Sequence, residues 1–150
     1  MNIDILNGMT VHVKTTSILG NGDRLQLQFL SSSDESAGSF HIVFRTEPAY
    51  FIGDCSGSYE PLSGTLPEGY EKTWSFRRTK EAGGGIRVQI GCGEFQLLDI
   101  LLTDTVCSSS NPWRNYWERD VAKINFPQQN IASPFYKITG FEKYLSNLKL

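Results

Sequence analysis

The stretch IRVQIGCGEF, residues 86–95, shows the pattern that decides the fold. Its apolar residues Ile86, Val88 and Ile90 occupy every second position, with arginine and glutamine between them, before a glycine-rich reversal. Successive side chains of a pleated strand point to opposite faces, so this spacing predicts a strand with one buried and one solvated face. The run after the reversal, residues 95–102, is apolar at nearly every position, as expected for a strand that is covered on both sides or that enters an end of the fold.

The same alternation recurs in short runs from Met9 to Thr139, about nine in all, and none carries a long helical stripe. This rhythm predicts an all-β fold, an antiparallel β-sandwich of the lectin-like jelly-roll type. The 150 residues suit a single domain, 1–150, with a core large enough to fold without cross-links. Helical spacing occurs in the tail, where we expect a short amphipathic turn, at Phe141, Tyr144, Leu145 and Leu148.

Composition and charge exclude several classes of function. The formal net charge is −2, without a basic patch, which argues against nucleic acid as a partner. No apolar stretch approaches the roughly twenty residues of a membrane-spanning helix, so we expect no membrane insertion. The first residues lack the basic and apolar regions of a secretory leader. Cysteine usage nevertheless leans toward an oxidising compartment, so we expect an extracellular protein whose leader was replaced by an added Met1, with cytosolic synthesis as the alternative.

Three cysteines allow one disulfide. Cys92 and Cys107 bracket the strand expected at 94–103, and a bridge between them would contribute about 3 kcal/mol by restricting the unfolded chain. Cys55 is then left over, as a free thiol or as a link to a second chain. The alternative is three buried, reduced cysteines that act as small apolar groups. Because no Cys-x-x-Cys or His-x-x-x-His pattern is present, we expect no structural zinc and no other metal.

Two polar side chains, His41 and Arg45, fall on the same face of one expected strand. A sugar ring is bound by a few directed donors and acceptors for its hydroxyl groups and by a flat apolar surface for its C–H face. A sheet holds such groups rigidly, and the two side chains have the arrangement that a sugar site needs. The alternative is an ordinary solvated face, on which they pair with Asp54 or Glu47.

The strand FHIVFR, residues 40–45, resembles the sugar-binding strand of galectins, whose polar face presents His, Asn and Arg at alternate positions. His41 and Arg45 match this motif, whereas Val43 stands where galectins have asparagine. The galectin Trp-Gly-x-Glu signature has its nearest counterpart in Tyr59-Glu60.

The galectin resemblance extends, as an order of strands, from Met9 to Phe126. It implies a jelly-roll lectin that binds galactosides, with glycans or glycoproteins as partners. On that basis Asp54 and Glu60 join the histidine and the arginine as candidate sugar contacts.

A second candidate is the loop WRNYW, residues 113–117, which carries three large aromatic residues. Each ring must either bury a large area or stay exposed for a partner. If the segment is extended, both tryptophans lie on one side and can stack on a sugar or on an apolar side chain of a protein. In the alternative, the rings cap an open end of the sandwich, with Arg114 or Arg119 over one of them. We favour capping for at least one tryptophan and keep Trp113 and Tyr116 as candidate ligand contacts.

No constellation for catalysis is found in the sequence. The two histidines, His12 and His41, lie on expected strands without a nucleophile motif, and the aspartates show no calcium-loop spacing. The triple glycine at 83–85 lacks the lysine and serine of a phosphate loop and is typical of a hairpin turn. We therefore expect a protein that is not an enzyme and that needs no cofactor.

Two classes of function remain. The first is a noncatalytic, carbohydrate-binding lectin that holds a glycan and gains avidity as a homodimer, through Cys55 or an exposed edge strand. The second is an extracellular interaction or matrix module that binds a protein partner through the tryptophan-rich loop. Binding to glycans distinguishes the first class from the second.

Overall fold

The computed structural model describes residues 8, 10–15, 24–44, 48–53, 55, 59–64, 66, 71–107, 112–125 and 135–139. These residues form ten strands and one short helix. In chain order they are β1 (Thr10–Thr15), β2 (Arg24–Leu30), β3 (Ser36–Val43), β4 (Ala49–Gly53), β5 (Glu60–Pro61), β6 (Lys72–Lys80), β7 (Ile86–Cys92), β8 (Phe95–Leu102), α1 (Trp113–Trp117), β9 (Lys123–Asn125) and β10 (Phe135–Thr139).

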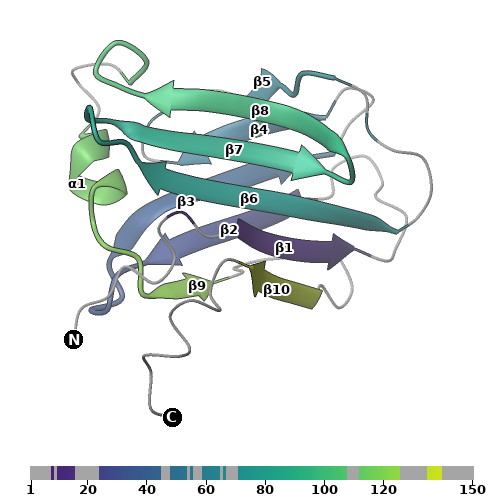
Figure 1. The fold of residues 1–150 in the computed structure, drawn as a ribbon, viewed down its shortest axis with the longest axis horizontal. Coiled ribbons are helices and arrows are strands. Elements are labelled where there is room, and N and C mark those ends of the chain that lie inside the picture. The colour runs from purple at the N-terminus through teal and green to yellow at the C-terminus, as the bar shows by residue number, and fades with distance from the viewer. Residues whose placement is uncertain are drawn as a thin grey trace.

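The strands form two five-stranded sheets, ordered β10-β1-β6-β7-β8 and β5-β4-β3-β2-β9. All paired neighbours are antiparallel. Figure 1 shows the sheets as two layers, with α1 at one end. The predicted antiparallel β-sandwich is confirmed, and the two-residue strand β5 raises the strand count above the expected nine.

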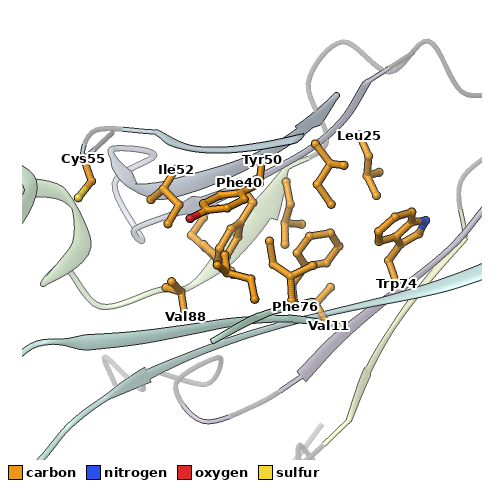
Figure 2. Packing of buried hydrophobic residues seen from close by; sticks show 14 of the residues in the cluster. Val11, Leu25, Phe40, Tyr50, Ile52, Cys55, Trp74, Phe76 and Val88 are labelled. Atoms are coloured by element: carbon orange, nitrogen blue, oxygen red, sulfur yellow. The ribbon is translucent and has the colours of Figure 1, made fainter. Parts of the chain in front are cut away.

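One hydrophobic core lies between the two sheets. On β1 and β7 every second residue is buried, as the alternation predicts, because the inward row of each strand is apolar apart from Thr15. Phe40 of β3 packs on Phe76 of β6 across the interface, with ring centroids 5.6 Å apart, and both rings lie between the sheets in Figure 2. The intervening polar side chains are therefore left on the two outer faces, where a ligand can reach them.

The register of β3 depends on a bulge. Two of its residues, Ala37 and Gly38, stand opposite the single residue Phe29 of β2. Gly38 has a φ of +102°, which residues with a side chain rarely adopt. Because side chains alternate with a period of two, the bulge sets the phase of the strand beyond it, so that Phe40 is buried and His41 faces outward.

Strand β8 departs from the sequence expectation. It is the edge strand of its sheet, and its outer face is open, since Phe95 is 48% exposed and Asp99 is also exposed. The strand is therefore not covered on both sides. The pairing of β8 with β7 shifts register next to Ile90, where β8 contains one extra residue, Leu97. As a result the consecutive residues Leu97 and Leu98 are both buried, which explains why apolar residues do not alternate there.

The hairpin turn predicted at the triple glycine is confirmed. Between β6 and β7, the N–H of Glu81 donates to the carbonyl of Gly85 at 3.1 Å, and Gly84 and Gly85 have positive φ. The helical turn expected at residues 141–148 lies outside the residues that the structure describes.

Gly38→Ala is expected to lower the free energy of unfolding by about 2–5 kcal/mol. The φ of Gly38 disfavours a side chain, and the new Cβ would lie 2.7 Å from Cε3 of Trp117. Gly83→Ala is the matched control, because a Cβ there meets no atom within 4 Å, and its expected effect is about 0.5 kcal/mol or less. Chemical denaturation followed by tryptophan fluorescence measures both variants, and equal midpoints would contradict the role assigned to Gly38.

Candidate functional site

The aromatic loop is a short helix, α1, which closes one end of the sandwich (Figure 1). Trp113 is 2% exposed and Trp117 is 0% exposed, so both indoles belong to the core. Their N–H groups are satisfied, because Trp117 Nε1 donates to the carbonyl of Gly53 at 3.0 Å and Trp113 Nε1 donates to Oδ1 of Asp104 at 3.3 Å. The predicted capping role is confirmed for both tryptophans. The other arrangement, an extended segment with Trp113 as a ligand contact, is wrong, because the helix turns both indoles inward, where they bury a large apolar area.

Arginines cover two aromatic rings of this helix, as the capping alternative predicted. The Cζ of Arg114 lies 5.4 Å from the ring centroid of Trp113, and the Cζ of Arg119 lies 5.3 Å from that of Tyr116. Tyr116 is half-buried and packs against the core. The alternative function, protein binding through exposed tryptophans of this segment, therefore has no exposed tryptophan to rest on. Among the aromatic residues of α1, only Tyr116 still reaches the surface.

A buried cation, Arg78 of β6, holds the helix in place. Its side chain is 1% exposed, and its guanidinium donates to the carbonyl of Trp117 and, at 3.0 Å, to the carbonyl of Arg119. The guanidinium also lies 6.0 Å from the ring centroid of Phe29. Carbonyls at the end of a helix need donors, and Nη2 of Arg78 supplies a donor to both of these carbonyls. Alternation along β6 places Arg78 on the inward row, which is the sequence signal that reveals it.

Arg78→Ala is expected to lower the free energy of unfolding by about 2–4 kcal/mol, because it leaves two carbonyls without a donor and opens a cavity. Arg77→Ala is the matched control on the same strand, since Arg77 is exposed and its loss is expected to cost about 0.5 kcal/mol or less. Denaturant titration of both variants gives the two free energies. The assignment of Arg78 as the anchor of α1 fails if the two arginines prove equally dispensable.

The disulfide joins Cys55 to Cys107, which are 52 residues apart in sequence and whose Cα atoms lie 5.1 Å apart. The predicted bridge between Cys92 and Cys107 is therefore wrong, and so is the spare Cys55 as a free thiol or as a link to a second chain. Cys92 is buried on the inward row of β7, whereas the segments that follow β4 and β8 meet at the bridge. Burial raises the pKa of the Cys92 thiol to about 11, so the group stays protonated and unreactive at neutral pH.

Alkylation with iodoacetamide at neutral pH is expected to leave the folded, unreduced protein unmodified, because its one free thiol is buried. Unfolding without a reductant exposes that one thiol, and unfolding with a reductant exposes all three cysteines. Intact mass counts the modified groups, and peptide mapping assigns the bridge. A mapped bridge that contains Cys92 would contradict the pairing.

His41 lies on the outer face of the sheet β5-β4-β3-β2-β9 and is half-buried. It stands in a row that crosses three strands, with Gln26 of β2 and Phe51 of β4 as its direct cross-strand neighbours. Its ring meets Phe51 edge-on, with centroids 5.4 Å apart, and its Nε2 lies 3.2 Å from Oγ of Ser39. Phe51 in turn contacts Tyr59, with centroids 5.5 Å apart. We call Gln26, His41, Phe51 and Tyr59 the His41 row.

Of the other predicted sugar contacts on the strands, the structure describes one, Glu60, and leaves two undescribed. Arg45 and Asp54 lie outside the residues that the structure describes, so their position relative to the row stays a prediction. Glu60 of β5 is exposed, and its carboxylate accepts a hydrogen bond from the hydroxyl of Tyr50 at 3.0 Å. Burial and this carboxylate raise the pKa of Tyr50 to about 12. Val43 is buried, so the position at which galectins carry asparagine adds no polar group to this face.

Comparisons with known proteins find a likeness among solved structures. No protein-family model matches the chain, and no curated protein matches it. Among solved structures, the chain is similar to a tetrameric galectin from the ball sponge Cinachyrella sp., with 13% sequence identity, 89% of each chain covered and a TM-score of 0.49. This likeness concerns the arrangement of the strands and carries no information on a ligand.

Two further properties concern the described residues alone. No helix in that part of the chain is long and apolar enough to cross a membrane. Within the same residues, no three His, Cys, Asp or Glu side chains gather in a way that would hold a metal ion.

Proposed function

We propose that this protein is a noncatalytic carbohydrate-binding protein, a lectin, that holds a glycan on the outer face of the sheet β5-β4-β3-β2-β9. The observation that carries the proposal is the His41 row, in which an imidazole stands between a side-chain amide and an aromatic ring on three paired strands. Hydrogen-bonded strands hold these side chains at fixed spacing, so the row is preorganised for a rigid ligand.

The row combines the two kinds of contact that a sugar ring needs. The imidazole of His41 and the amide of Gln26 supply directed donors and acceptors for sugar hydroxyl groups. The rings of Phe51 and Tyr59, both half-buried, supply apolar surface for the C–H face of the sugar. The site therefore suits a polyol with one apolar face rather than an anion or a metal ion.

Galactosides are the ligand class that the resemblance of residues 40–45 to galectins implies. Arg45, Asp54 and Glu60 complete the proposed set of contacts, and Tyr116 is retained as a further candidate. Glycans or glycoproteins are the proposed partners and the extracellular space the proposed location, in keeping with an internal disulfide. Pairing into a homodimer, which raises avidity, is proposed through an edge strand, since Cys55 is already bonded within the chain.

His41→Ala is expected to weaken glycan binding by about tenfold or more, because it removes the central hydrogen-bonding group of the row. His12→Ala is the matched control, since this histidine lies on β1 of the other sheet and its loss is expected to leave binding within about twofold. Binding of all three proteins to immobilised oligosaccharides that include β-galactosides is the measurement. The lectin proposal is rejected if the wild-type chain binds no glycan, or if the two histidine variants bind alike.

A further inference from the structure

The outer face of the sheet β10-β1-β6-β7-β8 carries a groove of about 230 Å³. Its walls come from β1, β6, β7 and β8, and the turn between β7 and β8 lies at one end. None of the candidate sugar contacts considered above lines it. The side chains that give the groove its chemistry are Ser75, Arg77, Gln89, Glu94, Phe95 and Gln96.

Glycines create the space in this groove. Gly91 occupies an outward position of β7, directly opposite Ser75 of β6. A Cβ on Gly91 would lie 2.6 Å from Oγ of Ser75 and 3.1 Å from the carbonyl oxygen of Phe95, so any larger residue would fill the floor. Gly93, in the following turn, continues this floor without a side chain.

The groove carries one cation and one anion. Arg77 is exposed, and its Nε donates to Oγ1 of Thr79 at 3.4 Å. No carboxylate within the described part of the chain forms an ion pair with Arg77, and no cation there pairs with Glu94, which is also exposed. The two opposite charges leave the groove with no net charge, and both side chains keep hydrogen-bonding capacity for a ligand.

A supporting network orients two amides at the groove wall. Arg87 Nη1 donates to Oδ1 of Asp99 at 2.9 Å, and this hydrogen bond holds the pKa of Asp99 below its usual value. The other oxygen, Oδ2, accepts hydrogen bonds from Nε2 of Gln89 at 3.3 Å and from Nε2 of Gln96 at 3.2 Å. With their amide nitrogens turned to the carboxylate, the two glutamines direct their carbonyl oxygens away from it, where they can accept hydrogen bonds from a ligand.

Phe95 gives the groove its apolar surface. Its ring is 48% exposed, although it belongs to one of the most hydrophobic residue types. A large exposed ring beside convergent polar groups is typical of a binding site rather than of a solvated strand. The groove is smaller than the roughly 300–1,000 Å³ of pockets that bury drug-sized ligands, so it suits a single ring.

We propose that this groove is a second saccharide-binding site, which takes one uncharged hexopyranoside ring. Phe95 contacts the C–H face of the sugar, Arg77 donates to its hydroxyl oxygens, and Glu94 accepts from its hydroxyl protons. An anionic ligand would meet Glu94 and a cationic ligand would meet Arg77, so a neutral polyol fits the pair best. The groove and the His41 row lie on the outer faces of opposite sheets, so one chain can hold two glycans, and the second site does not require the first to exist.

Titration of the isotope-labelled full chain with methyl glycosides of glucose, galactose and mannose tests this proposal. The backbone amides of Gly91 and Gly93 are expected to show saturable chemical-shift changes at millimolar sugar for at least one glycoside. Phe95→Ala and Glu94→Gln are expected to weaken that binding by about fivefold or more. Val106→Ala is the control for loss of an exposed apolar side chain, since Val106 is exposed and lies outside the groove.

His41→Ala separates this proposal from the first one. The second site is supported if the shifts of Gly91 and Gly93 persist in His41→Ala and fade in Phe95→Ala. It is overturned if neither glycine shifts in the wild-type chain, if Phe95→Ala binds as Val106→Ala does, or if methyl glucuronide binds more tightly than every neutral glycoside. Circular dichroism of each variant confirms that the exposed substitutions leave the fold intact.

Discussion

The guanidinium of Arg78, buried at one end of the sandwich, is the contact on which the rest of the structure depends. It donates to the carbonyl of Trp117, the last residue of α1, and to that of Arg119 just beyond, and so holds the helix against the core. The helix places the ring of Trp117 directly on Gly38, and Gly38 is part of the bulge that sets the phase of β3. A shift of one residue in that strand would turn His41 inward and its apolar neighbours outward. The orientation of the candidate sugar face is thus tied to a buried charge on the other sheet.

The two outer faces of the sandwich have different chemical character, although the core between them is shared. On one face, a side-chain amide, an imidazole and two aromatic rings form a row across β2, β3, β4 and the segment that precedes β5. On the other, opposite charges and an exposed ring surround a floor of glycine. The core decides the fold, whereas the outward side chains, which contribute little to packing, decide what the molecule recognises. Two such faces on one rigid body would let a single chain link two ligands.

Strands with a regular apolar rhythm were predictable from the sequence because a half-buried strand needs only local alternation. The inward rows of β2 and β7 follow it directly, and those of β1 and β6 depart from it at the buried residues Thr15 and Arg78. The helix α1 was not predictable in this way, because five residues are too few to show a helical period and their burial comes from contacts with both sheets. The same holds for the disulfide, since the distance between Cys55 and Cys107 depends on how distant segments meet.

The candidate site was likewise predictable from the sequence only in part. Alternation alone identifies His41 as an outward residue of its strand, but its neighbours Gln26 and Phe51 come from strands whose register is set by the bulge and by pairing. No local sequence motif predicts the groove around Phe95, because four strands contribute to it. The sequence by itself determined the sandwich, since period-two burial is a property of each strand alone. Only the tertiary structure decided which side chains share a surface, because strand register, sheet order and the packing of α1 bring together residues that are far apart along the chain.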